Sequence, residues 1–167
     1  MNLIGQVINA MIAYYAGDVR RINHFLKVYG FSKAIGEMEG LDESTQAILE
    51  IAALTHDIGI KNSEKKYNSS AGNYQQIEGP PEAKKLLEGL GIESGVIDRV
   101  CWLIAHHHTY TDIQEIDYQI LIEADFLVNA FEDNMPDASI ESFMNKVFVT
   151  KTGIGLLKTM YELQQKP

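Results

Sequence analysis

Apolar residues recur at the helical spacing of three and four positions along most of the chain. Residues that favour helix N-caps precede two of the clearest stretches: Asp18 precedes the first, and Asp42 or Ser44 the second. We find no run of alternating apolar and polar residues that would indicate a strand. We therefore predict an all-α fold in one domain, with helices over residues 1–17, 19–36, 45–57, 82–90, 93–107, 118–133, 139–148 and 153–165.

The segment 60–73 breaks this pattern, because it is rich in Asn, Ser, Gly and Lys. We expect a long loop there, of the kind that often carries function in a helical protein. Gly59 predicts the end of the helix before it. Pro80 and Pro81 predict the start of the next helix, because proline is tolerated in a first helical turn.

The formal net charge of −9 narrows the range of partners. It argues against general binding to a nucleic acid polymer or an anionic membrane. It leaves open a small phosphorylated molecule, because a metal ion or a few local cations can override the overall charge. Cys101 is the single cysteine, which excludes a disulfide within the chain. No apolar run approaches the ~20 residues of a membrane span, and we expect a cytoplasmic protein.

Two polar motifs lie within apolar helical segments, where they need partners. The stretch "AALTHDIGI" ends in the adjacent pair His56-Asp57, and Asp125 shares a predicted apolar face with Leu121 and Val128. Burying such groups without a partner costs roughly 2–7 kcal/mol for a neutral polar group and more for a charge. Each residue alone could be a hydrogen-bonded core residue or a solvated helix end. Together with His24 they form an ordered set that favours a common site.

A run of three histidines, His106 to His108, ends another predicted helix. On a regular helix His107 shares a face with Val100 and Leu103, whereas His106 points sideways. This geometry favours His107 as the residue that points inward. The choice between His106 and His107 stays open at this point, and the whole run could also be a solvated helix end favoured by the helix dipole.

His24, then His56-Asp57, then Asp125 resemble the H…HD…D signature of the HD superfamily of metal-dependent phosphohydrolases. The contexts "ALTHDIG" and "EADFL" are similar to the usual phrasing of that superfamily. The resemblance covers about residues 20–130. It implies a single HD-type helical domain over 1–167, in which C-terminal helices at 139–164 pack on a motif-bearing core at about 20–130.

The resemblance also implies a divalent metal ion held by His24, His56, Asp57 and Asp125. Two imidazoles and two carboxylates suit Mn, Fe, Co, Ni, Zn or Mg. An ion that accepts more than four ligands keeps positions for water and for a phosphate oxygen. Such an ion lowers the pKa of water and neutralises phosphoryl charge, and Asp57 is in addition a candidate acceptor for the attacking water.

Many two-metal members of the superfamily carry a further His between the HD pair and the next helix. The corresponding stretch here, "NYQQIEGPPEAKKLL", contains none, which argues against a second ion. Gln75 or Gln76 occupies roughly that place, and Glu78 is a candidate oxygen ligand for a second ion or a partner of the ligands. His107, with His106 as the alternative, is a candidate for a second ion, for phosphate binding or for protonating the leaving oxygen.

Two cations are placed to bind a phosphate. Arg20 lies one helical turn before His24, and Lys61 follows the HD pair by four residues. A guanidinium can bind a phosphate through two hydrogen bonds, and a lysine supplies a mobile point charge. Both residues could instead be solvated surface charges.

The sequence therefore predicts hydrolysis of a phosphate ester, on a nucleotide or another small phosphorylated metabolite, by a metal-activated water. A phosphodiesterase or pyrophosphohydrolase for a signalling nucleotide is the alternative enzyme, although the Gly-Tyr-Pro extension of cyclic dinucleotide phosphodiesterases is missing. A non-catalytic metal- or nucleotide-binding regulatory module is the alternative of another class. The absent His disfavours a di-iron oxygenase, although Glu78 leaves that alternative open. A homo-oligomer is also left open.

Overall fold

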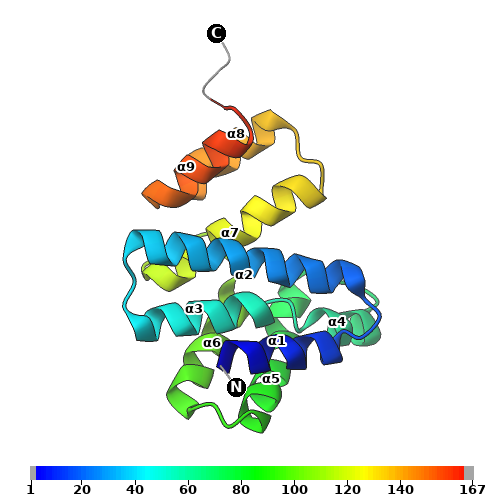
Figure 1. Cartoon of the computed structure of the whole chain (residues 1–167). Coiled ribbons are helices and arrows are strands. Elements are labelled where there is room, and N and C mark those ends of the chain that lie inside the picture. Colours follow the sequence, from blue (N-terminus) through cyan, green and yellow to red (C-terminus); the bar gives the residue numbers. More distant parts are fainter. Residues whose placement is uncertain (1–2, 164–167) are drawn as a thin grey trace.

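The computed structural model describes residues 3–163, and over that range it consists of α-helices with no strand (Figure 1). The predicted all-α fold is confirmed. The last helix ends at Met160, earlier than predicted, and the predicted residues 164–165 lie outside the described residues. The helices are α1 (Leu3–Tyr14), α2 (Val19–Glu39), α3 (Glu43–Thr55), α4 (Ile60–Tyr67), α5 (Gly72–Gly89), α6 (Ser94–His106), α7 (Ile116–Glu132), α8 (Asp137–Val147) and α9 (Lys151–Met160).

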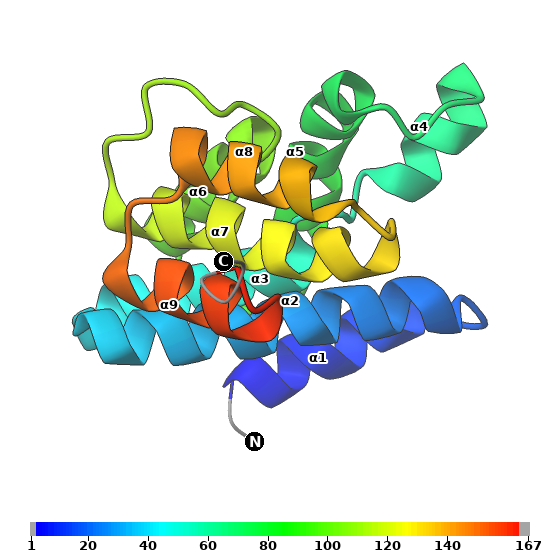
Figure 2. The ribbon, with the colours of Figure 1, turned by 90° about the horizontal axis from the view of Figure 1, so that it is seen from above.

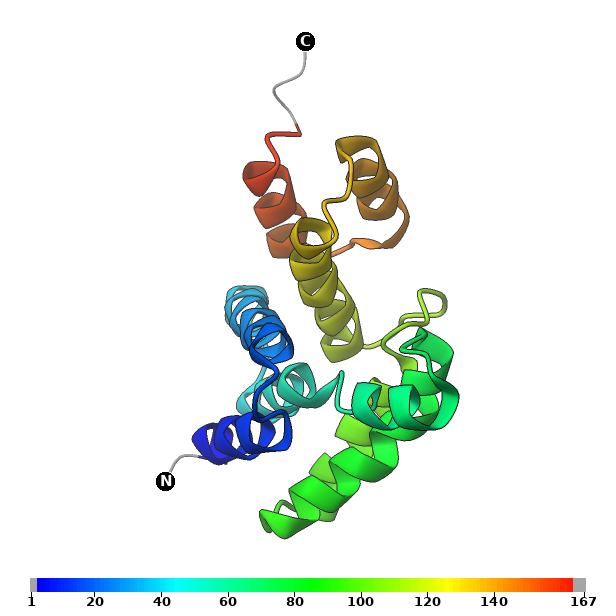
Figure 3. The ribbon, with the colours of Figure 1, turned by 90° about the vertical axis from the view of Figure 1, so that its right-hand side faces the viewer.

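The long helix α2 packs against α3 and α7 (Figures 1 and 3). Asp18 caps its start, because its carboxylate accepts a hydrogen bond from the backbone N–H of Arg21. Gly40 ends it in the left-handed conformation, with φ 77°. Val28 and Ile35 are buried on the same side as His24, so the apolar stripe of the helix carries the histidine into the interior.

The second half of α3 is buried on every side. Asp42 caps the helix by accepting from the backbone of Ser44 and Thr45, and residues 49–55 are all buried. The helix contacts α1, α2, α6 and α7. A helix that is surrounded in this way delivers the residues at its C-terminal end to the middle of the molecule. His56 and Asp57 are those residues.

Five of the remaining helices form two groups on either side of α2 and α3, while α1 packs on α3, and α4 packs on α5. The pair α5 and α6 packs together on one side, and α7 with α8 and α9 lies on the other (Figures 2 and 3). Phe126 of α7 stacks on Phe143 of α8 at a centroid distance of 3.9 Å. Glu123 of α7 accepts hydrogen bonds from the backbone N–H groups of Val149 and Thr150, between α8 and α9. The boundary of a motif-bearing core at about 20–130 stays a prediction.

The predicted loop at 60–73 is wrong for most of its length. Residues Ile60–Tyr67 form α4, and α5 already begins at Gly72. The helix α4 buries only Ile60 and Ser63, so its sequence has almost no apolar stripe. The Ser63 hydroxyl donates to the backbone carbonyl of Gly59, and Asn68 ends the helix with φ 52°.

The predicted helix start at Pro80 and Pro81 is also wrong, because both prolines lie inside α5. A proline inside a helix removes one backbone N–H donor, and α5 nevertheless continues through both prolines while it packs against α6. Ala83 and Leu87 are fully buried. An added Cβ at Gly79 would lie 2.5 Å from the Ile104 side chain, so α5 and α6 are in close contact at this point.

Gly59 does not end a helix in the left-handed conformation, because its φ is −72°. Its lack of a side chain serves close packing instead. A Cβ at Gly59 would lie 2.6 Å from the backbone nitrogen of Gly79 in α5. The turn after His56-Asp57 is thereby held directly against α5. No helix in residues 3–163 combines the length and the hydropathy that a membrane span requires.

Candidate metal centre

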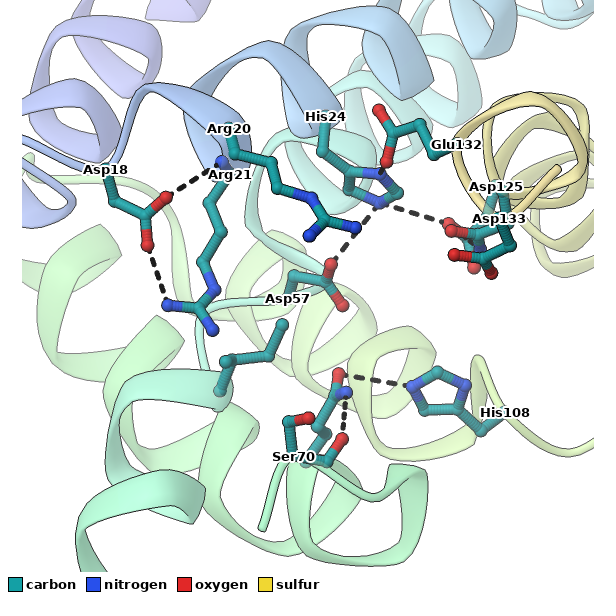
Figure 4. Close-up of a pocket in the computed structure, with 13 residues that line it drawn as sticks. Asp18, Arg20, Arg21, His24, Asp57, Ser70, His108, Asp125, Glu132 and Asp133 are labelled. Atoms are coloured by element: carbon teal, nitrogen blue, oxygen red, sulfur yellow. Dashed lines mark hydrogen bonds and ion pairs between the residues drawn. The ribbon is translucent and has the colours of Figure 1, made fainter. Parts of the chain in front are cut away.

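Four side chains of the predicted set converge in the middle of the fold. His24 comes from α2, His56 and Asp57 follow α3, and Asp125 comes from α7. Figure 4 shows His24, Asp57 and Asp125 directed toward one another. We call these four residues the first cluster. The Nε2 atom of His24 lies 3.2 Å from Nε2 of His56, 3.3 Å from Oδ2 of Asp57 and 3.3 Å from Oδ1 of Asp125. The Nε2 atom of His56 lies 3.5 Å from each of the same two oxygens.

These spacings fit the coordination of one divalent ion. Ligand bonds of about 2.1 Å place neighbouring donor atoms about 3.0 Å apart at right angles and about 3.4 Å apart in a tetrahedron. The two Nε2 atoms lie 3.2 to 3.5 Å from each other and from the carboxylate oxygens, which is close to these values. Two imidazole nitrogens at 3.2 Å also need a cation or proton between them, because their lone pairs otherwise face each other.

Each imidazole that faces this centre is oriented by a hydrogen bond at its other nitrogen. Nδ1 of His24 lies 2.9 Å from Oε2 of Glu132, and Nδ1 of His56 donates to the carbonyl of Ala53 at 2.8 Å. These acceptors fix the proton on Nδ1 and leave Nε2 with the lone pair that a metal needs. Asn129 further orients Asp125, because its Nδ2 donates to Oδ1 of that residue at 2.9 Å.

A second cluster, Asp57 with His107 and His108, shares Asp57 with the first. Nε2 of His107 lies 3.6 Å from Oδ1 of Asp57, the oxygen not directed at His24. Nδ1 of His107 donates to the Ile104 carbonyl at 2.7 Å, again leaving the lone pair on Nε2. That Nε2 atom is buried and has no hydrogen-bond partner among the described residues. An uncompensated buried acceptor next to a carboxylate fits a position for a metal ion.

His108 is the ligand candidate that sequence reasoning missed. Its Nε2 lies 3.1 Å from Oε1 of Gln75, whose own amide nitrogen donates to the Ser70 carbonyl. Gln75 therefore accepts the Nε2 proton of His108, so Nδ1 carries the lone pair. A Cβ on Gly72 would lie 2.7 Å from Cγ of His108, so this glycine leaves room for the ring. Gln75 lies roughly at the place of the absent family His. It orients the candidate ligand His108 through a hydrogen bond.

The ionisation of the first cluster favours a cation. Burial lowers the pKa of His24, but its hydrogen bond to Asp125 and the charge of Asp57 outweigh this and raise that pKa to about 9. Burial likewise lowers the pKa of His56, and the charges of Asp57 and Asp125 raise it on balance. In the metal-free protein these carboxylates thus attract a proton to the place where an ion would supply the positive charge.

The carboxylates show the complementary effect. Burial would raise the pKa of Asp57, but the charge of His56 and the contact with His107 hold it well below its usual range. Burial would raise the pKa of Asp125 too, and hydrogen bonds from His24 and His56 hold it well below the usual range. Burial and the neighbouring His107 lower the pKa of His108 to about 4, so at neutral pH it is uncharged, as a metal ligand must be.

A pocket of about 450 Å³ opens onto the first cluster (Figure 4). Arg20 and Arg21 line it on the side of α2, and Asn129 and Asp133 line it on the side of α7. Arg21 is paired with Asp18 at 2.7 Å and also with Glu64. The guanidinium of Arg20 has no ion-pair partner within residues 3–163, and Figure 4 shows it extending toward Asp57.

Three predicted site residues lie elsewhere. Nζ of Lys61 donates to the carbonyl of Tyr14 at 3.1 Å and lies over that ring, so it is directed away from the pocket. Glu78 is held by Lys66 at 2.6 Å and by the Tyr67 hydroxyl at 3.0 Å, and belongs to neither cluster.

His106 is the third. Its Nδ1 donates to the Trp102 carbonyl at 2.7 Å and its ring stacks on that indole. It belongs to neither cluster, whereas His107, 1 % exposed, points inward as the helical stripe predicted. The outward His106 and the inward His107 are adjacent in the sequence, and a single residue step turns the side chain by about 100°.

Comparison with known proteins places this site in a family. The family model for the HD domain matches residues 21–137, which include His24, His56, Asp57 and Asp125. The chain belongs to the HD domain family. The resemblance inferred from the H…HD…D order is therefore confirmed.

A solved structure supports the HD fold independently. A predicted HD superfamily hydrolase from an uncultured Thermotogales bacterium is similar with a TM-score of 0.67 and 20% identity. The match covers 95% of this chain and 84% of that one. No curated protein matches the chain. The HD family and the His/Asp clusters together support a metal-dependent hydrolase.

Proposed function

We propose that this HD-domain chain is a metal-dependent phosphohydrolase that acts on a nucleotide or another small phosphorylated metabolite. One observation carries the proposal. The two clusters share Asp57, and the first opens onto a pocket that also contains the unpaired guanidinium of Arg20. A site that combines metal ligands with a free guanidinium suits a phosphate, because guanidinium and phosphate form paired, charge-assisted hydrogen bonds.

The residues of the first cluster would hold the ion, and Asp57 with His107 and His108 would hold a second one. A bound divalent ion supplies a lower pKa for water and neutralises charge on the phosphoryl oxygens. Arg20 binds phosphate oxygens and turns the phosphorus toward the clusters. Asp57 accepts a hydrogen bond from the attacking water and so aligns it.

In the reaction, the oxygen of water forms a bond to phosphorus while the ester P–O bond breaks. The leaving oxygen takes up a proton, and the products are inorganic phosphate and an alcohol. Burial of the clusters strengthens the electrostatic interactions of Asp57 and Arg20 with the phosphoryl group, because the local dielectric is lower than that of water. Lys61 and Glu78 have no part in this scheme, since both are engaged elsewhere.

The test is phosphate release by the metal-stripped protein, with each of Mn, Fe, Co, Ni, Zn and Mg added back separately. The substrate panel covers nucleotides, sugar phosphates, cyclic dinucleotides and p-nitrophenyl phosphate. Asp57→Ala should abolish metal-dependent release while the circular dichroism spectrum stays helical. Release only from a diester or a pyrophosphate would favour the phosphodiesterase alternative. Metal and nucleotide binding without any release would favour the regulatory module and overturn the proposal.

A further inference from the structure

The pocket beside the first cluster has a lining that selects among phosphate esters. Its thirteen lining residues include no Phe, Tyr or Trp, and Ile60 is the single aliphatic side chain among them. The rest are charged or polar (Figure 4). A nucleobase is normally held by stacking on an aromatic ring or by an apolar slot. The rings in this lining are the imidazoles of His24 and His108, which belong to the two clusters, and the lining has no apolar slot.

The cations of the pocket limit the number of phosphates. Two arginines line it, but Arg21 is engaged by Asp18 and Glu64. Arg20 is left as the single lining cation without an ion-pair partner in residues 3–163. One free guanidinium suits one phosphoryl group. The lining carboxylates outside the first cluster, which are Asp18, Glu132 and Asp133, would repel the further charges of a diphosphate or triphosphate.

The side of the pocket formed by α7 offers acceptors. The Asp133 carboxylate is exposed and makes no side-chain hydrogen bond within the described residues. Asn129 uses its amide N–H on Asp125, which leaves its carbonyl oxygen free. Asn129 lies one turn after Asp125 on α7, and Asp133 directly follows the end of that helix, so both face the part of a substrate beyond the phosphate. Free acceptors of this kind bind hydroxyl groups.

We propose that the substrate is a small polyhydroxylated phosphate monoester, that is, a sugar or polyol phosphate, and not a nucleotide. The inference rests on the proposed function for the reaction at phosphorus. Arg20 binds the phosphate at the metal centre, while Asp133 and Asn129 accept hydrogen bonds from the hydroxyl groups.

Ribose 5-phosphate and adenosine 5′-monophosphate are the matched pair of substrates, because both carry a 5-phosphorylated pentose and one adds a base. With the most activating metal ion, we expect kcat/KM to be at least about tenfold higher for ribose 5-phosphate than for adenosine 5′-monophosphate. A factor of about ten corresponds to the free energy of one well-placed hydrogen bond. Calorimetric titration of the metal-free protein with both compounds should give the same order of affinity. Equal or better values for adenosine 5′-monophosphate in both measurements overturn the inference.

Two substitutions test the recognition of hydroxyl groups. Asp133→Asn should lower kcat/KM for ribose 5-phosphate about tenfold, because a charged acceptor is lost. The decrease on p-nitrophenyl phosphate, which has no hydroxyl group, should be clearly smaller. Asp98→Asn, at an exposed position on α6, is the matched control. An equal decrease on both substrates overturns the role of Asp133.

The proposed function and this inference fail in different ways. Absence of phosphate release from every compound, p-nitrophenyl phosphate included, contradicts the phosphohydrolase. The calorimetric order of the two pentose compounds then decides the ligand class by itself. Release from nucleotides in preference to sugar phosphates keeps the phosphohydrolase and overturns the substrate class.

Discussion

At the scale of single residues, Asp57 links the two clusters because its carboxylate oxygens face different histidines. Oδ2 is directed at His24 and His56, and Oδ1 at His107. Removing this one side chain therefore affects both clusters, whereas removing His108 affects only the second. The two substitutions have different consequences for the number of ions bound.

We predict two Mn²⁺ ions per wild-type chain at saturation, one for His108→Ala and none held tightly by Asp57→Ala. The physical reason is that each cluster loses affinity when a charged or imidazole ligand is removed. Equilibrium dialysis followed by elemental analysis measures the ratio. His106→Ala is the control, because its ring stacks on Trp102 outside both clusters. A ratio of one for the wild-type chain would contradict the second cluster as a metal site.

Glu132 affects the metal indirectly, through its contact with Nδ1 of His24. Replacing it by Gln keeps an acceptor but removes the charge, and partners of this kind typically change metal affinity about 10–100-fold when altered. We expect Glu132→Gln to weaken Mn²⁺ binding within that range in a chelator competition assay. Glu37→Gln, on the exposed side of α2, should leave the affinity as it is. Identical affinity of both variants would show that Glu132 does not orient the histidine.

Sequence reasoning identified some of the residues that form and support the two clusters. His24, His56, Asp57 and Asp125 are identifiable from their order and apolar surroundings. Glu132 was not, because its partner His24 lies 108 positions away and only the fold brings the two together. His108 was missed because the helical spacing was extended past the end of α6 at His106, where the backbone turns and two successive histidines reach the same carboxylate.

At the scale of elements, the packing of α5 against the turn after α6 sets the position of His108. Gly72, the first residue of α5, is in contact with that ring. We predict that Gly72→Ala displaces the imidazole, because an added Cβ would lie 2.7 Å from its Cγ. Metal binding at the second cluster and phosphatase activity should both fall, while the melting temperature changes little. Metal titration and calorimetric melting measure the two effects.

The matched control is Gly30→Ala. Gly30 lies inside α2, and nothing lies within 4 Å of the Cβ that it would gain. This variant should stabilise the protein by about 0.5–1 kcal/mol, because alanine favours a helix interior over glycine. Loss of the second ion in both variants would show that the effect at Gly72 is not a local contact.

The elements that were predicted correctly differ from those that were missed in how much apolar surface they bury. The helices α2, α3, α6 and α7 carry long apolar stripes, and their existence follows from periodicity. The helix α4 buries two residues, so its polar composition resembles a loop. The helix α5 continues through Pro80 and Pro81 because its packing on α6 outweighs the preference of proline for a helix start. A local sequence pattern does not reveal such packing.

At the scale of the whole molecule, the clusters lie where α2, α3, α6 and α7 meet, so their charge state contributes to folding stability. In the metal-free protein the pKa of His24 is raised to about 9 from 6.5. The stabilisation from its proton is complete below pH 6.5 and is lost as the pH rises toward 9. The lowered pKa values of Asp57 and Asp125 act oppositely, since their contribution is present above about pH 4 and is lost in acid.

These signs predict that alkaline pH destabilises the metal-free protein but not the metal-saturated protein. Between pH 6.5 and 9 the metal-free protein should lose free energy of unfolding, by about 3 kcal/mol at most for a shift of this size. The metal-saturated protein should lose none of this, because an ion replaces the proton and binds better as the histidines deprotonate. Urea unfolding with and without Mn²⁺ across this range measures both. The His24→Gln variant without metal should show a flatter profile. A metal-free wild-type protein that is equally stable at pH 6.5 and 9 would contradict the cation-attracting charge of the first cluster.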